Sequence, residues 1–318
     1  MNHRKHIVWR LVIPAVVVAT MVVVGATFLV RGIDGAATPQ AERSFATNSP
    51  WNTEIATNPA VDPRGAAMVG GVEKTPALYA NMYEYGIPIY QASSHTPTYP
   101  VKCTQTTWGP CPFDGKNVPI PDGAHPHTGS DGAMVVVDQQ AGITYEFWRA
   151  RHVNDVWSTA FGAINSLAGS GWGGAATGSG ASRLGGVIRL SEIANGDIPH
   201  ALALQTNNVC AGVFRAPALK TDGTSSRPDC IPEGARLQLD PAIDLKSLKL
   251  TPAQMAVATA MQRYGGYVVD VGGSPLSVSF ELDTRTSSSI SPIYKKAGLR
   301  WDFDDLSEIP WGRLRVVM

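Results

Sequence analysis

The chain has 318 residues, of which 44% are hydrophobic and 16% are charged, a balance typical of a globular protein with an apolar core. Its 26 Lys and Arg residues equal its 26 Asp and Glu residues, so it lacks the basic field that attracts nucleic acid, and we predict no nucleic-acid partner. With 32 Gly and 23 Pro residues, the composition favours turns and short strands.

The N-terminal region contains an uncharged, mostly apolar run at residues 11–30, about the length that crosses a ~30 Å hydrocarbon core as a helix. Arg4, Lys5 and Arg10 precede this run and favour a cytoplasmic N-terminus. We therefore predict that residues 1–31 are a cytoplasmic tip and transmembrane signal anchor. The protein would be a single-pass protein of the cell membrane with an extracytoplasmic C-terminal domain.

A cleaved signal peptide is the alternative, because "VGA" at residues 24–26 has the small-x-small form of a cleavage site. Cleavage near Ala26 would give a secreted protein. Residues 32–50 lack apolar periodicity and are rich in Ala, Thr, Ser and Pro, so we predict a tether there. Both alternatives export residues 32–318, of which residues 51–318 are the predicted extracytoplasmic β-rich domain.

The first elements predicted in this domain are a helix and two strands. Thr75 as N-cap, Pro76 as first helical residue and Gly86 as stop predict a helix at residues 76–85. The runs "IPIYQAS" and "YPVKC" follow as strands.

Four cysteines are spaced as two local pairs. Cys103 and Cys111 are eight positions apart, and Cys210 and Cys230 are twenty apart. Such gaps suit loop-closing disulfides in an oxidising compartment, so we predict that each cysteine pairs with its nearest neighbour. The Cys-x-x-Cys spacing typical of structural zinc sites is absent from the sequence.

The clearest β signal is a hairpin, in which "AMVVVD" and "ITYEFWRA" flank the turn "QQAG". The glycine-rich residues 169–186 then predict a flexible spacer or a lid. Thr251 and Pro252 begin the best helix, which Gly265 ends. Further strands are predicted at "IPHALALQ", "RLQLD", "YVVDV", "LSVSFEL" and "LRVVM". The fold class is mainly β with minor α, a β-sandwich or jelly-roll-like domain after one transmembrane helix.

Several ordered motifs carry a family resemblance that covers most of residues 50–318. They are "SDGAMVVVD", "YEFWRAR", "LGGVIRLSEIANGDIPHALAL", "IPEGARLQLDPAIDL", "MQRYGGYVVD" and "PWGRLRVV". The chain resembles a widespread family of exported actinobacterial proteins of uncharacterised function. The resemblance implies export and a shared domain, and it assigns no functional residue.

His125, His127 and Asp131 form an H-x-H-x3-D run that resembles the metal-binding strand of cupin barrels. Pro126 separates the two histidines, and no second half of the cupin motif follows. His200 would complete the set only if the fold brought it close. We predict solvated loop histidines, no metal and no cofactor.

Glu146 is the main catalytic candidate. Strand alternation places Glu146 and Trp148 on one face of the hairpin and Tyr145 and Phe147 on the other, more apolar face. Glu146 is therefore expected to face outward beside an aromatic ring, as a proton donor for glycoside cleavage would. In the alternative interpretation it is an ordinary solvated strand residue.

The second carboxylate would be Asp131 or Glu192, unless Asp131 is only a turn former or pairs with Arg149. His200 could act as a base with Tyr145 as proton donor, which is the chemistry of a polysaccharide lyase. A hydrogen-bonded core histidine is the alternative.

The predicted function is a membrane-anchored or secreted carbohydrate-active protein, a hydrolase or lyase acting on cell-envelope or environmental polysaccharide. The alternatives are a non-catalytic envelope module that binds glycan or a protein partner, and another enzyme, including a metal-dependent one. The predicted catalytic residues are Glu146, Asp131, His200 and Tyr145. The predicted substrate-binding residues are Trp148, Arg149, Trp172 and Glu192.

Overall fold

The computed structural model describes residues 43–73, 78–174 and 176–318. The predicted anchor at residues 11–30 and most of the predicted tether lie outside these residues. Among the described residues, no helix has both the length and the apolar character needed to cross a membrane.

The prediction of a mainly β chain with minor α structure is confirmed. The helices are α1 (Gly65–Glu73), α2 (Leu190–Asn195), α3 (Pro252–Arg263) and α4 (Pro292–Lys296). The first nine strands are β1 (Leu78–Asn81), β2 (Ile89–Ala92), β3 (Thr98–Cys103), β4 (Asn117–Pro119), β5 (Met134–Asp138), β6 (Ile143–Trp148), β7 (Arg151–Val153), β8 (Val156–Thr159) and β9 (Phe161–Ser166). The others are β10 (Leu202–Thr206), β11 (Val209–Phe214), β12 (Ile231–Glu233), β13 (Arg236–Leu239), β14 (Gly266–Val271), β15 (Leu276–Ser279) and β16 (Leu314–Val317).

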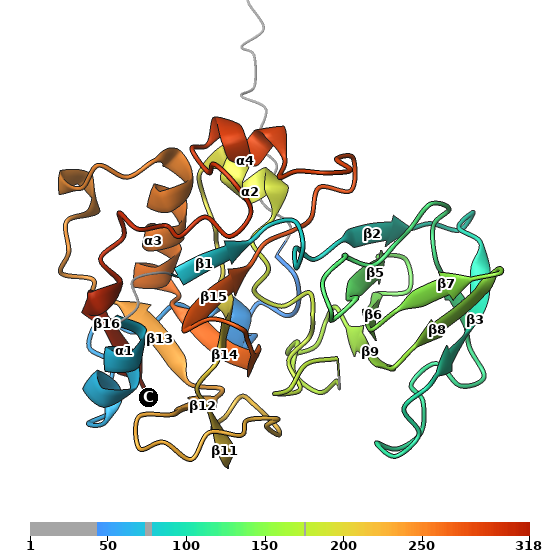
Figure 1. Ribbon diagram of the computed structural model, residues 1–318, viewed down its shortest axis with the longest axis horizontal. Coiled ribbons are helices and arrows are strands. Elements are labelled where there is room, and N and C mark those ends of the chain that lie inside the picture. Colours follow the sequence, from blue (N-terminus) through green and yellow to red (C-terminus); the bar gives the residue numbers. More distant parts are fainter. Residues whose placement is uncertain (1–42, 74–77, 175) are drawn as a thin grey trace, which may run out of the picture. The chain divides into compact units, whose positions relative to one another are not determined.

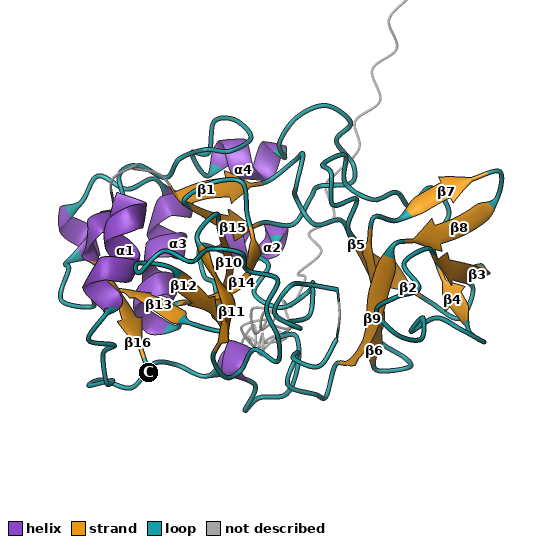
Figure 2. Ribbon diagram, turned by 60° about the horizontal axis from the view of Figure 1, so that its bottom comes forward, coloured by secondary structure: helices purple, strands orange, loops and turns teal. Residues whose placement is uncertain are grey.

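One six-stranded sheet carries the larger core, in the order β1-β15-β10-β14-β13-β16 (Figures 1 and 2). It mixes parallel pairs, such as β10 with β14, and antiparallel pairs, such as β13 with β16. Helix α3 begins as predicted, because the Thr251 hydroxyl accepts from Gln254 N and the Gln254 side chain accepts from Thr251 N. Its buried alanines, Val257 and Met261 pack into this core.

Strands β2 to β9 form two four-stranded sheets, in the orders β2-β5-β6-β9 and β4-β3-β8-β7 (Figure 1). The predicted hairpin is confirmed as β5 and β6, which pair antiparallel. Met134, Val136 and Phe147 pack in a core shared with β3, β4 and β8, whereas Val135 and Val137 belong to a second core on the other face. Both faces of β5 are thus covered. The finer assignment to a sandwich or jelly roll stays a prediction.

The predicted helix at residues 76–85 is wrong. The part of it that the structure describes contains strand β1, which pairs parallel with β15 from Leu78 to Asn81. Leu78 and Ala80 are fully buried, so burial alternates along the segment as in a strand. Tertiary burial here overrides the local helix-start signal of Thr75 and Pro76, which lie outside the described residues.

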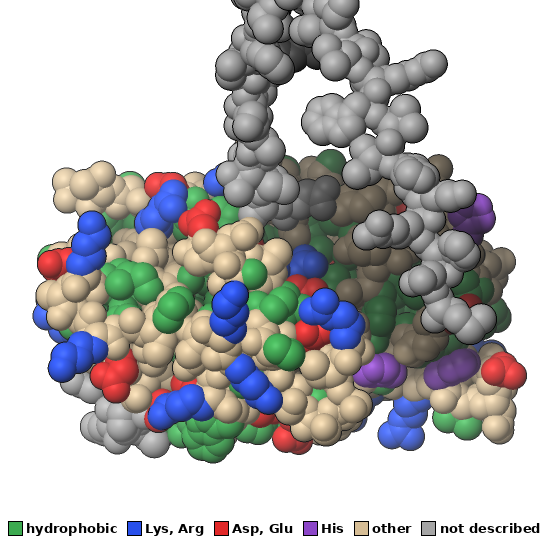
Figure 3. Space-filling model, turned by 90° about the horizontal axis from the view of Figure 1, so that it is seen from above, with side chains coloured by type: hydrophobic (Ala, Val, Ile, Leu, Met, Phe, Trp, Pro, Cys, Tyr) green, Lys and Arg blue, Asp and Glu red, His purple; other side chains and the backbone are tan. Residues whose placement is uncertain are grey.

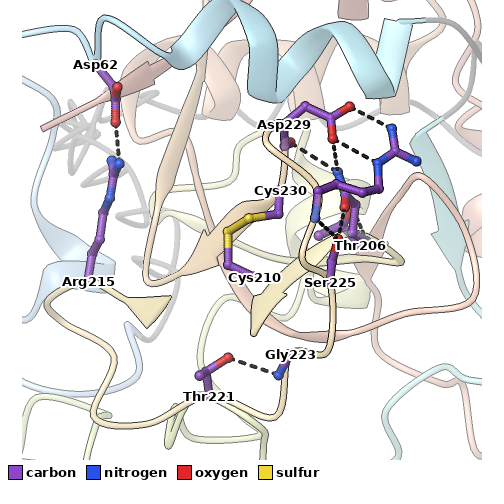
Figure 4. Close-up of a disulfide and its surroundings, with 11 residues drawn as sticks. Asp62, Thr206, Cys210, Arg215, Thr221, Gly223, Ser225, Asp229 and Cys230 are labelled. Atoms are coloured by element: carbon purple, nitrogen blue, oxygen red, sulfur yellow. Dashed lines mark hydrogen bonds and ion pairs between the residues drawn. A yellow bond between two sulfur atoms is a disulfide. The ribbon is translucent and has the colours of Figure 1, made fainter. Parts of the chain in front are cut away.

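Both predicted disulfides are confirmed, between Cys103 and Cys111 and between Cys210 and Cys230. They indicate an oxidising, extracytoplasmic environment. The second bond links β11 to the residue before β12 and closes the segment between them (Figure 4). Next to it, Asn208 donates to the Asp229 carbonyl at 3.0 Å. This closed segment carries part of the candidate site.

The surface in Figure 3 shows Lys and Arg side chains interspersed with Asp and Glu. The face therefore presents no field of one sign, in keeping with the equal numbers of acidic and basic residues in the chain.

Candidate functional site

The expectation that Glu146 faces outward is wrong, because its side chain is fully buried. It accepts hydrogen bonds from the Thr144 hydroxyl at 2.8 Å, the Arg183 backbone N at 2.7 Å, and the Ser182 hydroxyl. Since the segment around Ser182 covers this face of the sheet, both faces of β6 are buried. Strand alternation could not reveal that covering segment.

Glu146 is therefore a positioning residue for the segment that presents Arg183. We expect Glu146→Gln to lower the free energy of unfolding by about 1 to 2 kcal/mol, because the amide nitrogen of glutamine cannot accept a hydrogen bond and would leave a buried donor without a partner. Denaturant unfolding measures the loss. Glu308→Gln, at an exposed position, is the matched control and should change the value by less than about 0.5 kcal/mol. Equal values for the two variants would contradict this role.

Asp131 and Trp148 lie together, as the sequence analysis expected of a shared site. Trp148 Nε1 donates to Asp131 Oδ1 at 3.2 Å, and the Trp148 ring stacks on Trp108 with centroids 5.4 Å apart. The Arg149 guanidinium lies 4.4 Å from the Trp148 ring centroid rather than in an ion pair with Asp131. Tyr145 lies on the opposite face of β6, in the core between the two four-stranded sheets.

The other predicted residues lie elsewhere. His200 Nε2 is 3.0 Å from the buried carboxylate of Glu192, and both line a small cavity of about 20 Å³ that contains neither Asp131 nor Glu146. Burial opposes the charging of His200, but Glu192 outweighs it and raises the pKa of the histidine. Trp172 stacks on Trp51 at 5.1 Å. Glu146, Asp131 and His200 thus do not share one pocket.

The two motif histidines differ in environment. His125 is exposed and His127 is buried. Burial, reinforced by the nearby Arg183, lowers the pKa of His127 to about 4, so its imidazole is neutral at pH 7. The prediction that both are solvated loop residues is therefore wrong for His127.

A cluster of three carboxylates that the sequence analysis missed gathers at the end of the six-stranded sheet. Asp270 lies near the end of β14, Glu233 ends β12, and Asp222 comes from the disulfide-closed segment. One carboxylate oxygen of each lies within 4.8 Å of the others. Gly178 packs against the cluster, where any side chain would collide with Asp222 and Glu233. Part of the glycine-rich stretch, residues 176–182, is therefore buried rather than a solvated spacer.

Burial raises the pKa of two of these acids, Glu233 and Asp270. Burial, together with the negative charges of Asp222 and Asp270, raises the pKa of Glu233 to about 8. Burial also raises the pKa of Asp270 to about 7, although Arg183 opposes the shift. Glu233 Oε1 has no hydrogen-bond partner among the described residues. Asp270 therefore holds a proton for part of the time at neutral pH.

Two cations border the cluster. Arg183 Nη1 lies 3.3 Å from Asp270 Oδ2 and 4.0 Å from Asp131 Oδ2, and Lys220 Nζ donates to the Thr177 carbonyl at 2.7 Å. Three carboxylates form a donor set that a hard divalent cation can bind. The adjacent guanidinium and ammonium groups repel such an ion, however, and Arg183 offsets part of the negative charge by ion pairing with Asp270.

Two cavities meet at these residues. The tryptophan cavity, of about 510 Å³, is lined by Trp108, Trp148, Phe161, Lys220 and Asp222 among others. The tyrosine cavity, of about 460 Å³, is lined by Tyr79, Tyr85, His127, Gln205 and Phe303 among others. Asp131, Arg183, Asp270 and Val271 line both. Each cavity has the volume of an ordinary ligand site.

Comparison with known proteins yields no match to a family model, to a curated protein or to a solved structure. The resemblance to exported actinobacterial proteins therefore stays a prediction.

One sequence signal could have pointed to the cluster. Asp270 is an acidic residue inside the apolar strand run "YVVDV", and charged residues are seldom buried without a partner or a role. Asp222 and Glu233 offered no such signal, because Asp222 lies in a polar turn and Glu233 in a turn-like Pro-Glu-Gly run, and only the fold brings them to Asp270.

Proposed function

We propose that residues 51–318 form an exported carbohydrate-active enzyme that hydrolyses glycosidic bonds. The observation that carries the proposal is the pair Asp222 and Asp270, two carboxylates within 4.8 Å on the wall of an aromatic-lined cavity. Glycoside hydrolysis needs such a pair beside a surface on which a sugar ring can lie.

Asp270 is the proton donor in this proposal, because it still carries a proton near neutral pH and can protonate the leaving oxygen. Asp222 is the second carboxylate. Retaining enzymes hold their carboxyl groups about 5 to 5.5 Å apart, whereas inverting enzymes leave about 6.5 to 9.5 Å for a water molecule. The close approach of Asp222 and Asp270 favours the retaining arrangement, with Asp222 as nucleophile.

The stacked rings of Trp108 and Trp148 provide the sugar platform. Trp108 is 55% exposed, and Phe161 lies edge-on to it with ring centroids 5.8 Å apart. Trp148 is fixed by its bond to Asp131 and by Arg149 above its ring, so the platform is held in place before a ligand arrives.

Incubation of the purified full-length protein with a polysaccharide panel tests the proposal. The panel pairs neutral chains (dextran, mannan, xylan) with acidic ones (alginate, polygalacturonate). New reducing ends without unsaturated uronates are the expected result. Unsaturated uronates among the products would indicate elimination by a lyase instead of hydrolysis. Binding without cleavage would indicate a non-catalytic module. Loss of cleavage on adding a chelator would indicate a metal-dependent mechanism instead of acid catalysis by Asp270.

We also propose that residues 11–30 anchor the protein in the cell membrane, unless cleavage near Ala26 releases it. The apolar run supports this location, and the two disulfides agree with an extracytoplasmic domain.

A further inference from the structure

We infer that the enzyme binds a neutral polysaccharide across both cavities and cleaves it at an internal bond. This inference rests on the proposed hydrolytic function and adds the substrate class and the mode of attack. Its basis is the position of the carboxylates, since Asp270 lines both cavities and lies where they meet. A bond cleaved there would have sugar residues bound on either side.

The tyrosine cavity offers neutral hydrogen-bonding groups from three neighbouring strands. The Gln205 side chain on β10 donates to the Ser279 hydroxyl at 2.9 Å and accepts from the Ser277 hydroxyl at 3.0 Å, both on β15. Asn81 on β1 lies 3.5 Å from the same Gln205 oxygen. Amides and hydroxyls both donate and accept, so this row matches the hydroxyl groups of a sugar.

Aromatic rings border this row as well. Tyr79, Tyr85 and Phe303 line the tyrosine cavity, and Tyr85 lies 6.4 Å from Phe303 between ring centroids. The cavity thus combines apolar ring faces with polar groups, as the tryptophan cavity does on its own side of Asp270. Two sites of similar chemistry on both sides of the carboxylates suit a repeating chain.

The charges of the tyrosine cavity favour an uncharged chain. Its charged lining residues are Asp131, Arg183 and Asp270, and His127 is neutral at pH 7. Arg183 already lies beside both carboxylates, 3.3 Å from Asp270 and 4.0 Å from Asp131. Among the described residues that line the tyrosine cavity, no unpaired cation is left to neutralise a row of uronate carboxylates, which would be repelled in this cavity.

Viscosity and product length test this inference on whichever neutral polysaccharide of the panel is cleaved. A cut at an internal bond divides a long chain into two much shorter ones, so viscosity should fall steeply while few reducing ends have appeared, and early products should be long. Release of monosaccharides or disaccharides from the start, with viscosity falling slowly, would overturn it. So would preferential cleavage of alginate or polygalacturonate. If no polysaccharide is cleaved, the proposed function itself fails.

Tyr79→Ala probes the tyrosine cavity directly. Loss of one ring contact should lower kcat/KM on the long chain by about threefold to tenfold. It should leave the activity on an aryl monoglycoside of the same sugar within about twofold, because that substrate fits one cavity. Tyr99→Ala, which alters a tyrosine of β3 outside both cavities, should leave both activities unchanged. Equal activity of Tyr79→Ala and Tyr99→Ala on the long chain would exclude binding of the chain in the tyrosine cavity.

Discussion

Asp270→Asn is expected to reduce hydrolysis of the best neutral polysaccharide by a factor of about 10² to 10⁴, the usual contribution of a positioned general acid. Asparagine keeps the size of the side chain and can still accept from Gly178 N, which donates to Asp270 Oδ1 at 3.0 Å. It has no acidic proton to give to the leaving oxygen. Initial rates of reducing-end release measure the effect, and circular dichroism checks that the variant is folded.

Asp114→Asn is the matched control, since Asp114 is exposed and lines neither cavity, and it should retain full activity. A substrate whose leaving group needs no proton, such as a dinitrophenyl glycoside, separates the acid role from a structural one. Asp270→Asn should keep most of the kcat/KM on this substrate, which reports the first bond cleavage, whereas kcat should fall because Asp270 also serves as base for the second step of a retaining enzyme. Loss of kcat/KM toward both substrates in a folded variant would contradict the role of Asp270 as acid.

Local patterns predicted those elements whose signals lie within a few residues. The cap residues of α3, the two-strand pattern of β5 and β6, and the spacing of the four cysteines each depend on nearby chain, and all three predictions are confirmed. The helix predicted at residues 76–85 is wrong because the structure of this segment depends on distant chain. Its strand β1 is defined by parallel pairing with β15, almost two hundred positions away in sequence.

The candidate site could be predicted only in part, because its residues come from distant segments. Asp131 and Trp148 belong to the hairpin and were found there, and they lie on the cavity wall with Asp270. Glu146 seemed the better acid because alternation placed it beside Trp148. The segment that buries it and presents Arg183 follows some thirty-five residues later, and no short-range pattern shows where that segment packs.

Glu233→Gln is expected to stabilise the protein at pH 8 and to have little effect at pH 4.5. The pKa of Glu233 is about 8 in the folded protein and 4.5 in the absence of its surroundings. Between these values the folded protein retains a proton that the unfolded chain releases. The stability that depends on this proton is therefore complete below pH 4.5 and is lost as the pH rises toward 8, by an amount on the order of a few kcal/mol.

Glutamine has the shape of the protonated acid and does not titrate, so the variant escapes this loss. The difference in unfolding free energy between Glu233→Gln and the unaltered protein should grow steadily from pH 4.5 to pH 8, as measured by denaturant unfolding in the same buffers. Glu308→Gln should show no such trend, because Glu308 is exposed. If Glu233→Gln were destabilising at pH 8, the Glu233 carboxylate would have to be ionised in the fold, and a bound cation would then be the better account of the three-carboxylate cluster.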